Sequence, residues 1–147
     1  MNPPIDAVDR AILEILRDDA RTSLAKIALS VNVSESTAHR RLQSLVARGV
    51  IKQFTIVEDA QALGQDTEAL ISIRIKSESR SNLRSFYRFL VDLPQARHTY
   101  FIAGSNDFIV HVAVASAREL RDFVSDSISS HPDVASTTTA LIFEHGV

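Results

Sequence analysis

The apolar residues of the first fifty positions recur at the spacing of three short helices. Within each helix, side chains three or four residues apart share one face. The three apolar faces consist, in chain order, of Val8, Ile12, Ile15 and Leu16, then Leu24, Ile27, Ala28 and Val31, then Ala38, Leu42 and Leu45. Asp6, Ser23 and Ser34 precede these faces, where each side chain can cap the first turn of its helix.

The ends of these helices follow from individual residues. We expect the first helix to end near Asp18, the second at Asn32, which tolerates the left-handed conformation, and the third at Gly49. Three short helices bury little surface by themselves. Val50 to Val57 (VIKQFTIV) is rich in β-branched residues, and we predict that it forms a strand that completes this unit.

The hydrophobic pattern changes after residue 67. Ile71, Ile73 and Ile75 alternate with polar residues, which is typical of a strand with one buried face. A helix closed by Pro94 follows, and the order of strand, helix, proline and strand then recurs with Pro132. The apolar faces of the two helices comprise Leu83, Phe86, Tyr87 and Leu90, and Leu120, Phe123, Val124 and Ile128. The remaining predicted strands span residues 96–103, 108–115 and 134–143.

Two such units in tandem predict a ferredoxin-like βαββαβ domain, an antiparallel sheet with its helices on one face. The other face mixes apolar and polar residues, so we expect a partner chain to cover it. The fold class is therefore α+β. We assign residues 1–58 to a winged helix-turn-helix domain with a linker strand, residues 59–67 to a polar linker, and residues 68–147 to the βαββαβ domain.

The composition narrows the classes of protein that fit this pattern. The 147 residues include no cysteine, and the 5 histidines lack the spacing of metal ligands, so we expect neither a metal site nor a cofactor. No apolar run approaches the roughly 20 residues of a membrane helix, and we expect a cytoplasmic protein with no membrane partner. The formal net charge is −2, but residues 34–52 hold four basic residues against the single acid Glu35. This basic segment includes the third helix, where we expect contacts with phosphates.

The third helix carries residue types that suit a DNA major groove. On a helical wheel, Ser36, Arg40 and Gln43 point away from the buried side. Short hydroxyl side chains allow close approach to bases, and arginine can bridge guanine O6 and N7 or bind a phosphate. The candidate DNA contacts are Ser34, Ser36, Thr37, His39, Arg40, Arg41, Gln43 and Ser44.

Other interpretations of the same residues stay open. The hydroxyl residues can be no more than a helix start, and the arginines can belong to a solvated face. For His39 and Arg41, which flank the buried side, phosphate contacts or internal pairs are favoured over contacts with base edges.

The order of motifs along nearly the whole chain resembles that of the Lrp/AsnC family of leucine-responsive and asparagine-responsive regulators. The matching positions are Ile5-Asp6, Asp9, Ile12-Leu13, Ala20-Arg21, Ile27-Ala28 through Val33-Ser34, Arg41-Leu42, Leu45, Gly49-Val50-Ile51, Leu63-Gly64, Gly104 to Ile109, and Val134 with Thr137 and Thr139. The resemblance implies dimers built through the linker strand and the C-terminal sheets, and further assembly, commonly to octamers. It also implies amino acids as effectors, bound at interfaces near the Gly-x-x-Asp turn.

That turn, Gly104 to Asp107, joins the two middle strands of the predicted sheet. Gly104 permits close approach of backbone N–H groups, and Asp107 can pair with a ligand ammonium. The candidate effector-binding residues are Tyr100, Gly104, Ser105, Asn106, Asp107, Thr137 and Thr139. The alternative is a plain hairpin turn in which Asp107 accepts turn hydrogen bonds and the threonines simply favour a strand.

These observations together predict a transcription regulator and not an enzyme. Its partners are double-stranded DNA, bound at a palindromic operator by two recognition helices of a homodimer, and a small effector that changes the assembly. Two alternatives belong to other classes. One is an enzyme similar to siroheme decarboxylases, which resemble this family's fold, and the other is a ligand-binding assembly protein with a vestigial DNA module.

Overall fold

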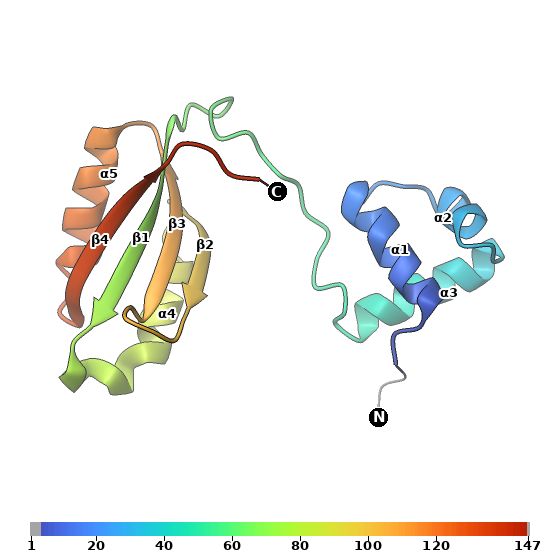
Figure 1. The fold of residues 1–147 in the computed structure, drawn as a ribbon, viewed down its shortest axis with the longest axis horizontal. Coiled ribbons are helices and arrows are strands. Elements are labelled where there is room, and N and C mark those ends of the chain that lie inside the picture. Colours follow the sequence, from blue (N-terminus) through green and yellow to red (C-terminus); the bar gives the residue numbers. More distant parts are fainter. Residues whose placement is uncertain (1–3, 147) are drawn as a thin grey trace. The chain divides into compact units, whose positions relative to one another are not determined.

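The structure is a computed structural model that describes residues 4–146. The chain separates into two compact units, Met1–Val57 and Glu58–Val147. Each unit has its own cluster of buried apolar side chains. The predicted α+β class is confirmed, with helices as the regular elements of the first unit from residue 4 onward and a helix-covered sheet in the second (Figure 1). The outermost positions of the predicted domains, 1–3 and 147, lie outside the described residues.

The N-terminal unit contains α1 (Ala7–Asp18), α2 (Leu24–Ser30) and α3 (Glu35–Ala47). All three predicted N-caps are confirmed. The Asp6 carboxylate accepts a hydrogen bond from the Asp9 N–H at 2.9 Å, and Ser23 and Ser34 cap their helices in the same way. The apolar faces of the three helices meet in a core whose buried members are Ile12, Ile27, Ala28, Ala38 and Leu45.

Two residues with positive φ mark the ends of α2 and α3. Asn32, between α2 and α3, has φ 55°, and Gly49, after α3, has φ 70°. Both predicted helix ends are thus confirmed. The turn between α2 and α3 is short because Asn32 reverses the chain within a few residues, which fixes the angle at which α3 leaves the unit.

The strand predicted over Val50 to Val57 is wrong for the single chain. Ile51 packs against the helical core, but residues 52–58 form neither strand nor helix. A strand needs a hydrogen-bonded neighbour, and no described segment pairs with these residues. The side chains of Phe54, Ile56 and Val57 are consequently 53%, 76% and 71% exposed.

The C-terminal unit is built on an antiparallel sheet with the strand order β2-β3-β1-β4. The strands are β1 (Thr67–Ile75), β2 (Ala96–Phe101), β3 (Phe108–Val114) and β4 (Val134–Ile142). The helices α4 (Leu83–Val91) and α5 (Ala117–Phe123) lie on the same face of this sheet (Figure 1). Ile71, Ile73 and Ile75 of β1 are buried beneath the helices, as their alternation predicts. The predicted βαββαβ arrangement is confirmed.

Both helical segments of this unit differ in detail from the prediction. A 3-10 helix, Ser77–Asn82, precedes α4, and a π-helical segment, Val124–Ser129, extends α5. Because hydrogen bonds in a π helix join residues five apart, this segment keeps Ile128 on the same side as Phe123, and both are buried. Among the described residues, no helix has both the length and the apolar character needed to cross a membrane.

The left-handed turn at Asn32 leads to the first prediction. We expect Asn32→Ala to lower the free energy of unfolding by about 1 kcal/mol, because a Cβ without a compensating polar group is unfavourable at positive φ. Asn32→Gly should leave stability unchanged or raise it, since glycine adopts this conformation freely. Thermal unfolding followed by circular dichroism checks both variants. An Asn32→Ala protein as stable as Asn32→Gly would contradict the role given to this turn.

Candidate functional site

The outward face of α3 presents the polar side chains that the helical wheel predicts. Ser36, His39, Arg40 and Gln43 are exposed, whereas Thr37 and Ser44 are half-buried. The first turn of the helix is ordered by its hydroxyl groups. Ser34 Oγ accepts from the Thr37 N–H at 3.2 Å and lies 2.9 Å from Thr37 Oγ1 and 3.0 Å from Ser36 Oγ. The hydroxyls therefore start the helix and also form a small polar surface at its N-terminal end.

Arg40 is the basic side chain on this face that is available to a partner. It is exposed, and the structure gives it no hydrogen bond or ion pair within residues 4–146. It lies one turn beyond the Ser34–Thr37 cap and has Gln43 beside it on the exposed face. An arginine and a glutamine one turn apart on an exposed helix can both reach base edges in a major groove.

Arg41 has a different role, and the internal alternative left open for it is the one that the structure shows. Its guanidinium Nη1 lies 2.7 Å from an Asp6 carboxylate oxygen and 2.9 Å from one of Asp9. Asp9 is buried, so this arginine supplies the opposite charge that the carboxylate needs. The pair ties α1 to α3. Through Nη1, this guanidinium is engaged inside the N-terminal unit.

The same contacts shift two pKa values. The pKa of Asp6 is lowered, first by the hydrogen bond from the Asp9 backbone and then by the hydrogen bond from Arg41. The pKa of Arg41 is raised by its hydrogen bonds to Asp6 and Asp9. Both groups are therefore more firmly charged than they would be in water, and the link between α1 and α3 persists at neutral pH.

In the C-terminal unit, the turn between β2 and β3 is anchored by the buried side chain of Asp107. One carboxylate oxygen accepts from the Ile75 N–H at 2.8 Å, and the other accepts from Arg80 Nη2 at 2.9 Å. The Asp107 N–H donates to the Ile73 carbonyl, and the Asp107 carbonyl accepts from Ile102. Asp107 thus joins the start of β3 to the end of β1. With 6% exposure and both oxygens engaged, it is an internal anchor and not a free acceptor for a ligand ammonium.

The other residues of the turn remain accessible. Gly104 and Ser105 are exposed and Asn106 is half-buried. Gly104 has φ 143°, a conformation that side chains rarely adopt, so glycine is required by the shape of the turn. The turn is therefore accessible at Gly104 and Ser105 and fixed in place at Asp107.

The remaining predicted effector residues lie elsewhere in the single chain. Thr137 and Thr139 are on β4, which β1 separates from β3 and the turn before it. Thr137 Oγ1 lies 3.0 Å from Ser129 Oγ, and Thr139 lines a hollow of about 430 Å³ beside Leu120 and Val124 of the second helical segment. Tyr100, on β2, is exposed and its ring stacks with that of His98. Tyr100 is on the strand that leads into the turn, whereas Thr137 and Thr139 are one strand away from it within a single chain.

Two features near the turn are not predicted by the residue pattern. One is Arg80, the ionic partner of Asp107, which lies in the 3-10 helix that the sequence pattern did not predict. The other is a hollow of about 700 Å³ between α4 and β2, lined by Leu83, Arg84, Tyr87, Arg88, Thr99, Tyr100, Phe101 and Ile102. The polar and apolar spacing of α4 could have indicated it, since Tyr87 and Arg84 are one helical turn apart at the edge of the apolar face.

Each of the two units matches a known protein family. Residues 5–52 match the winged helix-turn-helix DNA-binding family, and residues 68–145 match the Lrp/AsnC ligand binding domain. The chain is 41% identical over 141 residues to the HTH-type transcriptional regulator AldR of Mycolicibacterium smegmatis, covering 96% of this chain and 82% of that protein. It is 29% identical over 137 residues to the leucine-responsive regulatory protein of Rhizobium meliloti, covering 93% of this chain and 88% of that protein.

A solved structure extends the likeness to three dimensions. The structure of AsnC from E. coli superposes with a TM-score of 0.85 at 28% identity, and the match covers 99% of this chain and 96% of that one. A capped helix-turn-helix followed by a helix-covered βαββαβ sheet defines a two-domain regulator that binds DNA and a ligand. The chain belongs to the Lrp/AsnC family of transcriptional regulators.

The exposed face of α3 leads to a prediction about DNA. We expect Arg40→Ala to weaken binding to operator DNA by about 1–3 kcal/mol, roughly 5- to 150-fold, because it removes the exposed guanidinium of this face. The melting temperature should not change. The matched control is Arg118→Ala, which removes an exposed arginine of α5 and should bind DNA like the parent. Equal affinity of the parent and Arg40→Ala, measured by fluorescence anisotropy at fixed salt, would rule out this arginine as a DNA contact.

Proposed function

We propose that this regulator binds a palindromic operator as a homodimer, with one α3 helix on each half-site, and that an amino acid controls how the dimers assemble further. The observation that carries the proposal is the combination of a free, polar α3 face with an exposed apolar segment immediately after it. Helix-turn-helix dimers place their two recognition helices about 34–36 Å apart, one turn of the duplex. Catalysis has no part in this proposal.

The apolar segment supplies the contact between subunits. Phe54, Ile56 and Val57 are exposed and follow one another along a stretch without hydrogen-bonded neighbours. Such a stretch is unfavourable in water both for its apolar side chains and for its unpaired backbone. Pairing with the same segment of a second chain satisfies both requirements at once, in an antiparallel two-stranded ribbon with two-fold symmetry. The C-terminal sheets also take part in the dimer, and dimers assemble further, to an octamer, as the family resemblance implies.

An amino acid suits the turn between β2 and β3 as effector. Its carboxylate can accept hydrogen bonds from the N–H groups of Gly104 to Asn106, while Asp107 and Arg80 hold the turn in place. Thr137 and Thr139 of a neighbouring subunit then complete the site. The name of the Rhizobium meliloti relative, a leucine-responsive protein, supports the amino-acid class. A ligand that binds between subunits shifts assembly because it contacts one arrangement better than another.

The whole proposal is tested by binding to the DNA upstream of its own gene, with and without each of the twenty amino acids. We expect specific binding that weakens with salt, as phosphate contacts require, and an assembly state that changes with at least one amino acid. Binding that does not distinguish this DNA from an unrelated duplex would contradict the regulatory function.

The dimer contact leads to a separate prediction. We expect Ile56→Lys to convert the dimer to a monomer at micromolar concentration and to weaken operator binding at least tenfold, because a charge cannot be buried in the paired segment. The control is Leu29→Lys, which introduces the same charge at an 83% exposed position of α2 and should remain dimeric. Sedimentation velocity measures both. A stable Ile56→Lys dimer would show that the contact lies elsewhere.

The effector site is tested by substituting its anchor. We expect Asp107→Ala to weaken amino-acid binding at least tenfold, because the turn loses its links to Ile75 and Arg80. Asp107→Asn keeps an oxygen for Ile75 but loses the charge that faces Arg80, and it should bind with intermediate affinity. The control is Asp92→Ala, which removes an exposed aspartate at the end of α4 and should bind the amino acid like the parent. Equal affinities of the parent and Asp107→Ala in calorimetry would show that the segment from Gly104 to Asp107 is a hairpin turn and not an effector site.

A further inference from the structure

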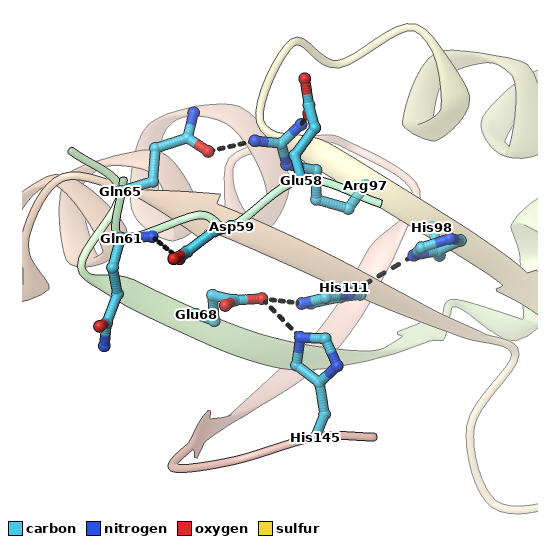
Figure 2. Close-up of polar contacts among 9 residues, drawn as sticks. All are labelled: Glu58, Asp59, Gln61, Gln65, Glu68, Arg97, His98, His111 and His145. Atoms are coloured by element: carbon cyan, nitrogen blue, oxygen red, sulfur yellow. Dashed lines mark hydrogen bonds and ion pairs between the residues drawn. The ribbon is translucent and has the colours of Figure 1, made fainter. Parts of the chain in front are cut away.

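Three potential metal ligands from distant parts of the sequence lie together on the sheet face opposite the helices. Glu68 is on β1, His111 is on β3, and His145 is in the tail after β4 (Figure 2). One ligand atom of each lies within 4.8 Å of the other two. In the strand register His111 lies opposite Leu70, so Glu68 is its diagonal neighbour on the same face.

Two of the three separations are close to those of a coordination sphere. His111 Nε2 lies 2.6 Å and His145 Nε2 lies 3.4 Å from the same oxygen of Glu68. Ligands at about 2.0–2.2 Å from a tetrahedral zinc ion are about 3.4 Å from one another. The His145–Glu68 pair already has this spacing, and the His111–Glu68 pair reaches it with a shift of less than about 1 Å, within the rotamer freedom of a glutamate.

The surroundings of the cluster also suit a bound cation. His98 lies opposite His111 in the register, and the Nδ1 atoms of the two rings are 3.5 Å apart. An imidazole that binds a metal through Nε2 commonly donates its Nδ1–H to a neighbouring acceptor, and His98 is placed to be that acceptor. His111 and Glu68 are largely buried, whereas His145 is half exposed at 44%. Two ligands are thus fixed by the sheet, and the third can close from the tail.

A polar cavity of about 310 Å³ leads from solvent to Glu68 and His145. Its lining includes the acidic residues Asp59, Asp66 and Glu144. Arg97 is hydrogen-bonded to Gln65 of this lining and is paired with Glu58 at 2.9 Å, so its charge is partly balanced (Figure 2). The cavity therefore offers a cation an entry path of favourable potential and leaves room for a water in the fourth coordination position.

We propose that Glu68, His111 and His145 form a binding site for a divalent first-row transition metal, with zinc as the best match. Two imidazoles and one carboxylate are a donor set that zinc accepts, whereas calcium and magnesium prefer oxygen ligands alone. Metal binding ties the C-terminal tail to β1 and β3 on the sheet face where the proposed subunit contacts lie. None of its three ligands belongs to the residues assigned to the effector or to DNA.

The test is zinc binding to the full-length protein, purified with a chelator and then dialysed free of it. We expect calorimetry to give one zinc per chain, with at least tenfold weaker binding in His145→Ala and in Glu68→Gln. His39→Ala removes an exposed histidine of α3 and is the matched control, which should bind zinc like the parent. His145→Ala lies in the tail, outside the buried core, so its melting temperature without zinc should equal that of the parent.

A second measurement follows the C-terminal tail directly, without measuring an affinity. Zinc should slow hydrogen exchange in residues 143–146 of the parent and leave these residues unchanged in Glu68→Gln. The proposal is overturned by a parent protein that binds no zinc at a large molar excess of the metal. It is equally overturned by unaltered zinc affinity in His145→Ala, or by an equal loss of affinity in His39→Ala.

Discussion

The register of β1 between β3 and β4 is the constraint on which most of the C-terminal unit depends. Because side chains alternate across a strand, a shift of one residue would exchange every buried isoleucine of β1 for its polar neighbour. The observed register places Ile71 opposite Val110 on one side and Thr139 on the other. It buries the helix-facing row and, on the opposite face, brings Glu68 beside His111. Its end at Ile75 also provides the N–H that Asp107 accepts.

In the N-terminal unit, one ion pair has a comparable role. The core of this unit is small, so the orientation of α3 depends on more than apolar contact. Arg41 links α3 to the two carboxylates of α1, one of them buried. Neighbouring arginines of α3 thus have opposite functions: Arg41 holds the helix from within, and Arg40 is left free on the outer face.

The sequence predicted what depends on local pattern. The caps at Asp6, Ser23 and Ser34, the left-handed turn at Asn32 and the buried alternation of β1 are all recognisable from residue type and spacing, and the structure confirms them. The strand at Val50 to Val57 failed in the single chain because residue type favours an extended conformation but does not provide a partner. The π-helical form of the segment after α5 was missed because Leu120, Val124 and Ile128 share a face in an ordinary α-helix as well, so their spacing does not distinguish the two forms.

The side-chain partners were harder to predict than the elements. Arg41 and Arg40 are adjacent and identical in type, so spacing alone left open whether Arg41 pairs internally. Asp107 and Arg80 are separated by 27 positions, and Glu68, His111 and His145 by still more, so that only the sheet topology brings each group together. For the same reason, histidines that looked scattered along the chain gave no sign of a shared site.

The two buried cores share no residue, which has a consequence for how such regulators diversify. Substitutions at positions without common neighbours act almost additively on stability. A lineage can therefore rebuild the turn around Gly104 or the histidine-bearing sheet face and respond to a new chemical signal while the packing beneath α3 is left intact. The reverse also holds, because residues of the DNA-binding unit can change without altering the core of the ligand-binding unit. The ligand recognised and the DNA sequence bound can therefore evolve separately, although a few residues of extended chain join the two units.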